Sequence, residues 1–404
     1  MKLLRVLLLV LLSAGALRAQ EPGSELRVFL MTLGPGDAVW ERFGHNAIVV
    51  EDARVGYSIA YNWGMFDFDQ PGYVPRLMKG QMMYWMAGYD TQAFANVYVQ
   101  SNRSIWLQEL NLTPQQKIAM RDFVEWNAQE SNKFYRYDYY RDNCSTRVRD
   151  AIDRALGGQL ATSLRSKPTD ATYRSQTQRL TYIDPLTYTG LQLAMGNPIE
   201  DPLTAWEESF IPMELRDWVR QVQVRAANGQ MVPLVTREVT MFEAQREPLA
   251  ESPPNLIIWY LLIGLLLGGA LLLLARGTLS GARLLVLAAV ISLWSFVVGF
   301  FGLLISLLWA LTDHWPTYYN ENILQANVLS LVLSGFAVTA LLRARGQRTA
   351  MRLALVIAGL SVLGFMLQVF PRLDQVNGEI IALFMPVHIA IAYILSSPRK
   401  TVTA

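Results

Sequence analysis

The sequence predicts an α+β domain outside the cytoplasm, followed by an all-α domain of five membrane helices. Short runs rich in β-branched residues alternate with turn and helix signals over residues 20–246, whereas residues 256–400 form long apolar runs separated by short loops. The chain of 404 residues contains a single cysteine, so no disulfide can form within it. No basic patch interleaved with aromatic residues is present, which argues against a nucleic-acid partner.

Residues 1–19 have the pattern of a secretory signal peptide. Lys2 and Arg5 precede a short apolar run at 6–12, and small residues follow at 13–19. The apolar run is too short to span a bilayer. We therefore expect export of the domain at 20–246.

Five strands and one helix are expected in the first half of this domain. The strands are expected at 24–33, 46–51, 57–63, 82–89 and 104–110. Thr113 is the expected N-cap of the next helix, with Pro114 at its first position. Strands mixed with helices in this way predict the α+β class.

The only cysteine, Cys144, lies at the predicted start of another helix. Asp142 or Asn143 can cap this helix, and the glycines at 157–158 can end it. Backbone N–H groups at a helix start stabilise a thiolate, so we expect a thiol pKa below the usual value of about 8.5, with Arg147 adding to the effect. The alternative is that Cys144 is a small buried apolar residue without chemistry.

His45 is the only histidine of the soluble part and is therefore the candidate base for Cys144. It precedes the strand at 46–51, and the next strand carries Asn62, our first candidate for the group that orients the imidazole. The alternatives for this third group are Asp52, Tyr61 and Asp67. The other two histidines, His314 and His388, lie in or beside the membrane region and are left outside the catalytic set.

The expected membrane spans are 256–275, 284–311, 326–342, 353–370 and 380–396, after a hinge with three prolines at 247–255. Loops 276–283 and 343–352 and the tail at 398–400 hold eight basic and no acidic residues, whereas loops 313–325 and 371–379 hold one arginine. The positive-inside rule places the soluble domain outside. The polar residues of loop 313–325 are expected to be solvated or to contact a lipid headgroup or an incoming protein.

Three motifs, "FGHNAI", "YNWGMFDF" and "RDNCSTRVRDAI", resemble those of the Lnb family of bacterial lipoprotein N-acyltransferases. The order of histidine strand, second strand and cysteine helix also resembles the permuted papain-like fold of lecithin:retinol acyltransferase and the NlpC-type peptidases. The resemblance implies a multi-pass protein of the bacterial inner membrane with a periplasmic domain. It further implies that Cys144 accepts an acyl chain from a membrane phospholipid as a thioester, with His45 as base and acid. The implied acceptor is the N-terminal amine of a diacylglyceryl-modified lipoprotein.

Substrate contacts are expected from Tyr61, Trp85 and Asn143. Trp85 belongs to segment 76–89, which is rich in methionine and aromatic residues and could line an acyl-chain groove or touch the membrane surface. An ordinary core strand is the more common explanation of such a segment.

Two other functions stay open. With water as acceptor, the same residues would make a periplasmic Cys–His hydrolase, either a peptidase or a phospholipase. A non-enzymatic envelope sensor or assembly protein would leave Cys144 inert. Five membrane helices favour the acyltransferase, because a cell-wall hydrolase needs at most an anchor. Neither a metal-ligand cluster nor a phosphate-binding loop is found in the sequence, so we expect no metal and no cofactor.

Overall fold

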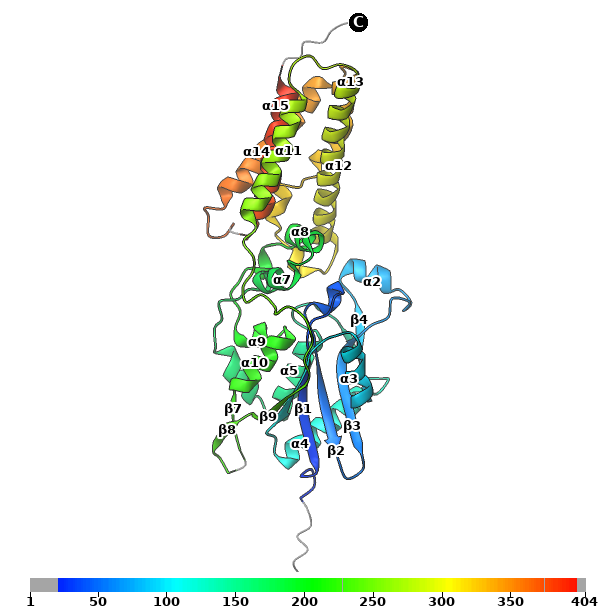
Figure 1. The fold of residues 1–404 in the computed structure, drawn as a ribbon, viewed down its shortest axis with the longest axis vertical. Coiled ribbons are helices and arrows are strands. Elements are labelled where there is room, and N and C mark those ends of the chain that lie inside the picture. Colours follow the sequence, from blue (N-terminus) through cyan, green and yellow to red (C-terminus); the bar gives the residue numbers. More distant parts are fainter. Residues whose placement is uncertain (1–20, 227, 374, 398–404) are drawn as a thin grey trace, which may run out of the picture. The chain divides into compact units, whose positions relative to one another are not determined.

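The computed structural model describes residues 21–226, 228–373 and 375–397 (Figure 1). The expected signal peptide lies outside these residues. Packing divides the chain into two compact units. The first contains the chain up to Asp67, Met83–Thr169 and Thr204–Arg246; the second contains Phe68–Met82, Asp170–Leu203 and the chain from Glu247 onward. Two segments of the stretch expected to be periplasmic, 68–82 and 170–203, therefore pack with the membrane helices.

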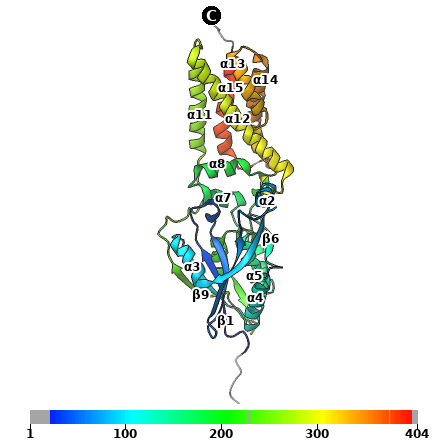
Figure 2. The ribbon, with the colours of Figure 1, turned by 90° about the vertical axis from the view of Figure 1, so that its right-hand side faces the viewer.

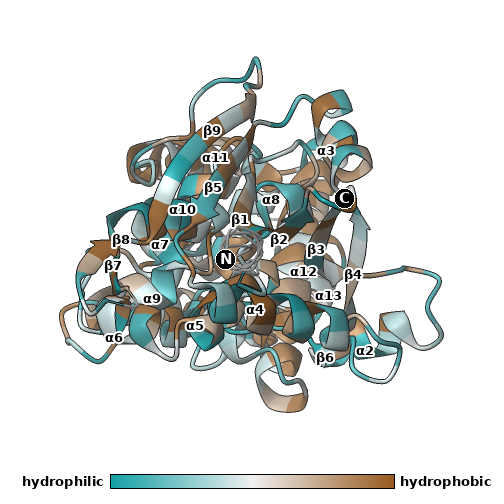
Figure 3. Cartoon of the chain, turned by 90° about the horizontal axis from the view of Figure 1, so that it is seen from below, coloured by the Kyte–Doolittle hydropathy of each residue, from teal (hydrophilic) through white to brown (hydrophobic). Residues whose placement is uncertain are grey.

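A seven-stranded antiparallel sheet is the centre of the first unit, in the order β6-β4-β3-β2-β1-β5-β9. The strands are β1 (Leu26–Leu33), β2 (His45–Asp52), β3 (Tyr57–Met65), β4 (Met83–Asp90), β5 (Ile105–Leu110), β6 (Phe134–Arg136) and β9 (Val235–Phe242). The first five correspond to the predicted strands, whereas β6 and β9 were not predicted. The edge strand β9 is largely exposed, with polar and apolar residues interleaved along it (Figure 3).

Helices cover both faces of this sheet (Figure 2). One face packs on α4 (Pro114–Asn127), α5 (Cys144–Ala155) and α10 (Pro212–Gln221), and the other on α3 (Thr91–Gln100). Because side chains alternate along a strand, Leu30 and Ile48 enter the first core while Met31 and Val49 enter the second. The remaining elements are η1 (Val39–Glu41), α6 (Gln159–Arg165), α9 (Ala205–Glu208), β7 (Gln223–Arg225) and β8 (Met231–Pro233).

The predicted start of α4 is confirmed. Thr113 Oγ1 accepts the N–H of Gln116 at 3.3 Å, and Gln116 Oε1 accepts the N–H of Thr113 at 2.9 Å. This reciprocal pair satisfies two N–H groups that a helix start would otherwise leave without partners.

Within the described residues, the second unit has five helices long and apolar enough to cross a membrane, as predicted. Four of them are α11 (Ile257–Leu274), α12 (Gly281–Leu311), α14 (Gln347–Leu367) and α15 (Gly378–Ser396); the third span in chain order, Glu321–Leu342, ends with α13 (Leu329–Leu342). The same unit contains α2 (Tyr73–Lys79), α7 (Tyr173–Thr181), α8 (Pro185–Ala194), η2 (Asn197–Ile199), η3 (Trp315–Thr317) and η4 (Glu321–Leu324).

Two glycines let α11 approach α15 closely. A Cβ atom on Gly264 would lie 2.6 Å from the carbonyl oxygen of Ala382, and one on Gly268 would lie 3.0 Å from that of Pro386. Small residues at this spacing are a common device for packing helices within a membrane. Pro386 has no N–H to donate to the Ala382 carbonyl, which is the group that faces Gly264.

The polar residues of loop 313–325 hold α8 in place. Asn320 Nδ2 donates to the carbonyls of Leu193 and Ala194, both at 2.9 Å, at the end of α8. Asn322 Nδ2 donates to a third carbonyl of α8 at 2.9 Å, and both asparagines are buried. For Asn320 and Asn322 the expectation of solvation or headgroup contact is therefore wrong, because the end of α8 takes their hydrogen bonds, whereas Asp313 in the same loop is exposed.

Candidate thiol site

Asn143 fixes the position of Cys144 at the start of α5. Its Oδ1 accepts the N–H groups of Ser145 at 2.9 Å and Thr146 at 3.0 Å, and its Nδ2 donates to two backbone carbonyls at 2.9 and 3.1 Å. Both polar atoms of the side chain are thus engaged by the backbone. This arrangement gives Asn143 a positioning role and offers no support for the predicted substrate contact.

His45 and Asn62 meet across the β2–β3 pair. In the register of these strands Ala47 lies opposite Asn62, and His45 Nε2 lies 3.3 Å from Asn62 Oδ1. The Asn62 Nδ2 group donates to the carbonyl of Ala87 on β4 at 3.3 Å, which orients the amide. Since an amide oxygen can only accept, Nε2 carries the hydrogen and Nδ1 keeps its lone pair.

Gly64 is the point at which the cysteine and the imidazole approach each other. A Cβ atom at this position would lie 3.3 Å from Cys144 Cβ and 3.6 Å from His45 Cε1. Gly64 has φ of +97°, beside a β-bulge between Asn62 and Met65. Sequence analysis did not single out Gly64, although an isolated glycine within a strand is the usual signal for a bulge or a close approach.

Both reactive groups are neutral at pH 7. They keep some exposed surface, but protein atoms surround them closely. Burial lowers the pKa of His45 to about 4, with the charge of Arg103 acting in the same direction and Asn62 opposing it. Burial also raises the pKa of Cys144 to about 11, against the backbone N–H groups of Asn46 and Ser145. The expectation of a lowered thiol pKa is therefore wrong, because desolvation outweighs the helix start.

The positive charge that acts on both His45 and Cys144 is that of Arg103, whereas Arg147 was expected. Arg147 forms an ion pair with Asp142. This carboxylate offsets the positive charge that was expected to act on the thiol. The buried guanidinium of Arg103 lies 4.6 Å from the Tyr98 ring centre and 3.2 Å from a carboxylate oxygen of Glu41. Its charge lowers the pKa of both the imidazole and the thiol. No local sequence signal distinguishes Arg103 from the other arginines.

Tyr61 and Trp85 lie in a shallow groove of about 570 Å³ on the first unit. Its lining residues are Tyr57, Ile59, Tyr61, Trp85, Met86, Ala87, Gly88, Glu125, Ala128 and Lys133. The hydroxyl of Tyr61 bonds that of Tyr57, and neither Cys144 nor His45 lines the groove. Tyr61 and Asp52 were alternatives to Asn62 as the group that orients His45. Tyr61 bonds Tyr57 instead, and Asp52 pairs with Arg54 at the far end of β2.

A row of aromatic rings runs outward from the thiol. The ring centres of Tyr137 and Tyr84 are 4.1 Å apart, those of Tyr84 and Phe66 5.1 Å, and those of Phe66 and Trp40 6.5 Å. Tyr137 is close enough to Cys144 for a thiolate there to raise the tyrosine pKa, in addition to the larger effect of burial. Trp40, at the other end, is 63% exposed. This aromatic row, which the sequence did not predict, connects an exposed tryptophan with a tyrosine near the thiol.

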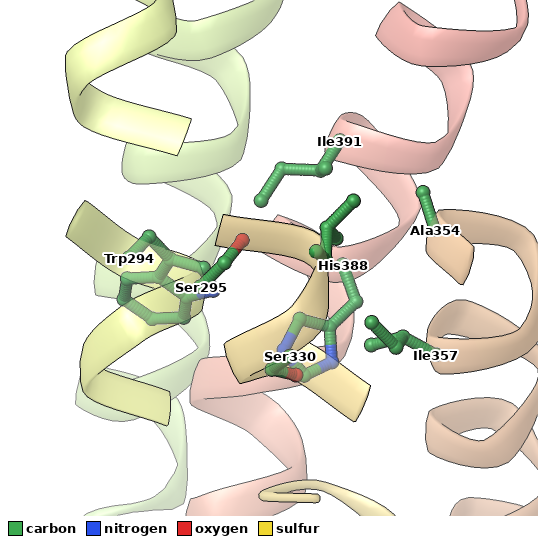
Figure 4. Close-up of a pocket in the computed structure, with 8 residues that line it drawn as sticks. Trp294, Ser295, Ser330, Ala354, Ile357, His388 and Ile391 are labelled. Carbon is green, nitrogen blue, oxygen red and sulfur yellow. The ribbon is translucent and has the colours of Figure 1, made fainter. Parts of the chain in front are cut away.

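His388 lines a separate cavity within the membrane unit (Figure 4). The lining residues are Trp294, Ser295, Ser330, Leu333, Ala354, Ile357, His388 and Ile391. His388 Nδ1 lies 3.3 Å from Ser361 Oγ. The cavity volume of about 10 Å³ suits one water molecule and excludes an acyl chain or a headgroup.

Cysteine at a helix start, histidine on the neighbouring strand and an amide at the histidine are the components of a thiol-dependent enzyme site. The comparison with protein families is consistent with an enzyme. Residues 16–179 match the model of the Lnb N-terminal periplasmic domain, and the match includes His45, Asn62 and Cys144. Neither curated proteins nor solved structures give a match. The family match and the five apolar helices indicate a membrane protein with a periplasmic domain.

Proposed function

We propose that this protein is an acyltransferase of the bacterial inner membrane that N-acylates lipoproteins through a thioester at Cys144. The observation that carries the proposal is the approach of Cys144 and His45 at Gly64, with Asn62 on the far nitrogen of the imidazole. A phospholipid is the proposed acyl donor. The N-terminal amine of a diacylglyceryl-modified lipoprotein is the proposed acceptor.

In the first half-reaction, His45 Nδ1 takes the thiol proton as Cys144 Sγ attacks the ester carbonyl of the donor. The carbon–oxygen ester bond breaks, His45 returns the proton to the leaving glycerol oxygen, and the acyl group stays on sulfur. In the second, the amine attacks the thioester carbonyl while His45 accepts a proton from nitrogen, the carbon–sulfur bond breaks, and His45 returns the proton to the Cys144 sulfur. No oxidant or cofactor is required by this sequence of steps.

Backbone N–H groups from the start of α5 and from β2 support the role of Cys144 as nucleophile. The N–H groups of Asn46, Ser145 and Cys144 itself favour negative charge on Sγ. Donors held in this position can also stabilise the oxyanion that forms during acyl transfer. The aromatic row gives an acyl chain a surface beside the thiol, which a peptidase for polar cell-wall peptides does not need.

Intact-protein mass spectrometry tests the proposal. Wild type and Cys144→Ser are incubated in nanodiscs with phospholipid whose acyl chains carry an isotope label, before and after neutral hydroxylamine. A labelled acyl increment on wild type alone, removed by hydroxylamine, is the expected result.

The same reaction with a lipoprotein acceptor separates the possible donors. Transfer of label to the lipoprotein amine is expected from the phospholipid donor. N-acylation without label would overturn the phospholipid as donor and assign that role to the glyceryl ester of the lipoprotein. If no adduct and no N-acylation form under any condition, acyl transfer itself is excluded.

A further inference from the structure

Two short elements of the membrane unit expose apolar side chains. On α2, Val74 and Met78 are one helical turn apart and are 58% and 67% exposed. At the start of α8, Ile183 and Leu186 are 64% and 85% exposed. Single exposed apolar residues are common on protein surfaces. Whether these four form a binding surface therefore depends on where they lie in the unit.

The helix α8 crosses the outer ends of two membrane helices. The hydroxyls of Thr189 and Tyr260 are hydrogen-bonded, and Tyr260 belongs to the first turn of α11. The helix α8 also contacts α15. Leu186 precedes Thr189 by one turn. Figures 1 and 2 both show α8 at this end of the helix bundle, where the apolar spans begin.

The helix α2 is attached at the same end of the unit. The N–H of Asp313, two residues beyond α12, donates to the carbonyl of Lys79 at 2.8 Å. His314 Nε2 lies 2.8 Å from the carbonyl oxygen of Leu77, and Gln81 Nε2 donates to the Asp313 carboxylate at 2.8 Å. These bonds hold α2 beside the outer end of a membrane helix.

We propose that α2 and the start of α8 are interfacial anchors that dip into the outer leaflet of the bilayer. The inserting side chains are Val74, Met78, Ile183 and Leu186. Lipid is the occupant of this surface because both elements adjoin the outer ends of helices whose sides are themselves exposed and apolar, as at Trp259, which is 64% exposed. Lys79 is exposed next to Met78, where its ammonium group can reach headgroup phosphates.

This inference depends only on the membrane helices and not on the acyl-transfer chemistry. It also gives a function to α2, which follows the site strand β3 by a short connection.

Depth-dependent fluorescence quenching in nanodiscs tests the inference. The full chain carries Cys144→Ser, so that single cysteines can be labelled with an environment-sensitive fluorophore at Leu186 and at Met78. Val55→Cys, in the β2–β3 turn and 75% exposed, is the aqueous control; Leu266→Cys, on α11 and 72% exposed, is the control for the hydrocarbon interior. The lipids carry a nitroxide either near the headgroup or deep in the acyl chain.

Quenching several-fold above that of the Val55 control is expected for Leu186 and Met78, and greater with the shallow nitroxide than with the deep one. The Leu266 control should show the opposite preference. Quenching at both positions equal to that at Val55 would overturn the inference. A response at only one position would overturn it for the other element. Thermal unfolding of each labelled protein checks that the fold is retained, and acyl transfer plays no part in the readout.

Discussion

Replacing Gly64 by alanine is the most direct test of the thiol site. The new Cβ atom would lie 3.3 Å from Cys144 Cβ, closer than the roughly 3.5–4.0 Å of an ordinary carbon contact, and 3.6 Å from His45 Cε1. Cys144 must therefore move away from the new Cβ atom by a few tenths of an ångström, whereas the distance to His45 is an ordinary contact. Since a 1 Å misplacement can cost about 100-fold in rate, we expect thioester formation to slow by about tenfold. The backbone at φ of +97° adds a stability loss of about 1–3 kcal/mol.

Gly56→Ala is the matched control for this substitution. Gly56 also has a positive φ, +67°, but a Cβ atom there meets nothing within 4 Å. Its cost should be confined to a backbone strain of about 1–2 kcal/mol. The assay is the initial rate of hydroxylamine-sensitive acyl adduct formation, measured beside thermal unfolding. If Gly64→Ala keeps the rate of Gly56→Ala, close approach of thiol and imidazole at Gly64 is not required, and the proposed site is wrong.

Three further predictions concern the thiol, its orienting amide and the membrane helices. Because the pKa of Cys144 is raised to about 11, its alkylation by iodoacetamide should rise about tenfold per unit from pH 6 to 9; a rate that is level over this range would indicate a preformed thiolate. Asn62→Ala should slow thioester formation by roughly 100-fold, whereas Asn62→Asp should raise the pKa of His45 and move the acid limb of the pH–rate profile upward; an unchanged profile would contradict an orienting role. Gly264→Leu should destabilise the membrane unit by about 1–3 kcal/mol in thermal unfolding, whereas Gly269→Leu, with no neighbour within 4 Å, should not; equal melting would show that the close approach of α11 and α15 is unimportant.

Local signals explain why much of the fold could be predicted. The strands β1–β5 are runs of β-branched, aromatic and other apolar residues, and the start of α4 is specified by Thr113 and Gln116 within four residues. The strand β9 could not be predicted as a partner of β5, because over a hundred residues separate them and the pairing depends on tertiary contact. The same limit applies to α2, whose place in the membrane unit depends on bonds to Asp313 and His314.

Some residues of the candidate site could likewise be predicted from local signals, and others could not. Cys144 and His45 could be selected because each is the only residue of its type in the soluble part, and Asn62 because side chains alternate along paired strands. Arg103 and Gly64 could not be selected, because they come close to Cys144 and His45 only in the folded structure and no local sequence pattern indicates this. The thiol pKa was assigned the wrong direction because a helix start is visible in the sequence, whereas the burial that outweighs it is not.

A neutral resting pair changes the role of the helix start in the proposed mechanism. The N–H groups around Cys144 Sγ do not ionise the thiol, because burial of the site costs more than they supply. Interactions accelerate a reaction only where they are stronger in the transition state than in the ground state. When His45 removes the thiol proton, negative charge develops on sulfur and then on the acyl oxygen. The same N–H groups then donate hydrogen bonds to a charged atom in surroundings of low dielectric. Burial therefore suppresses the thiolate in the absence of substrate, and it strengthens these hydrogen bonds once an acyl ester is in place.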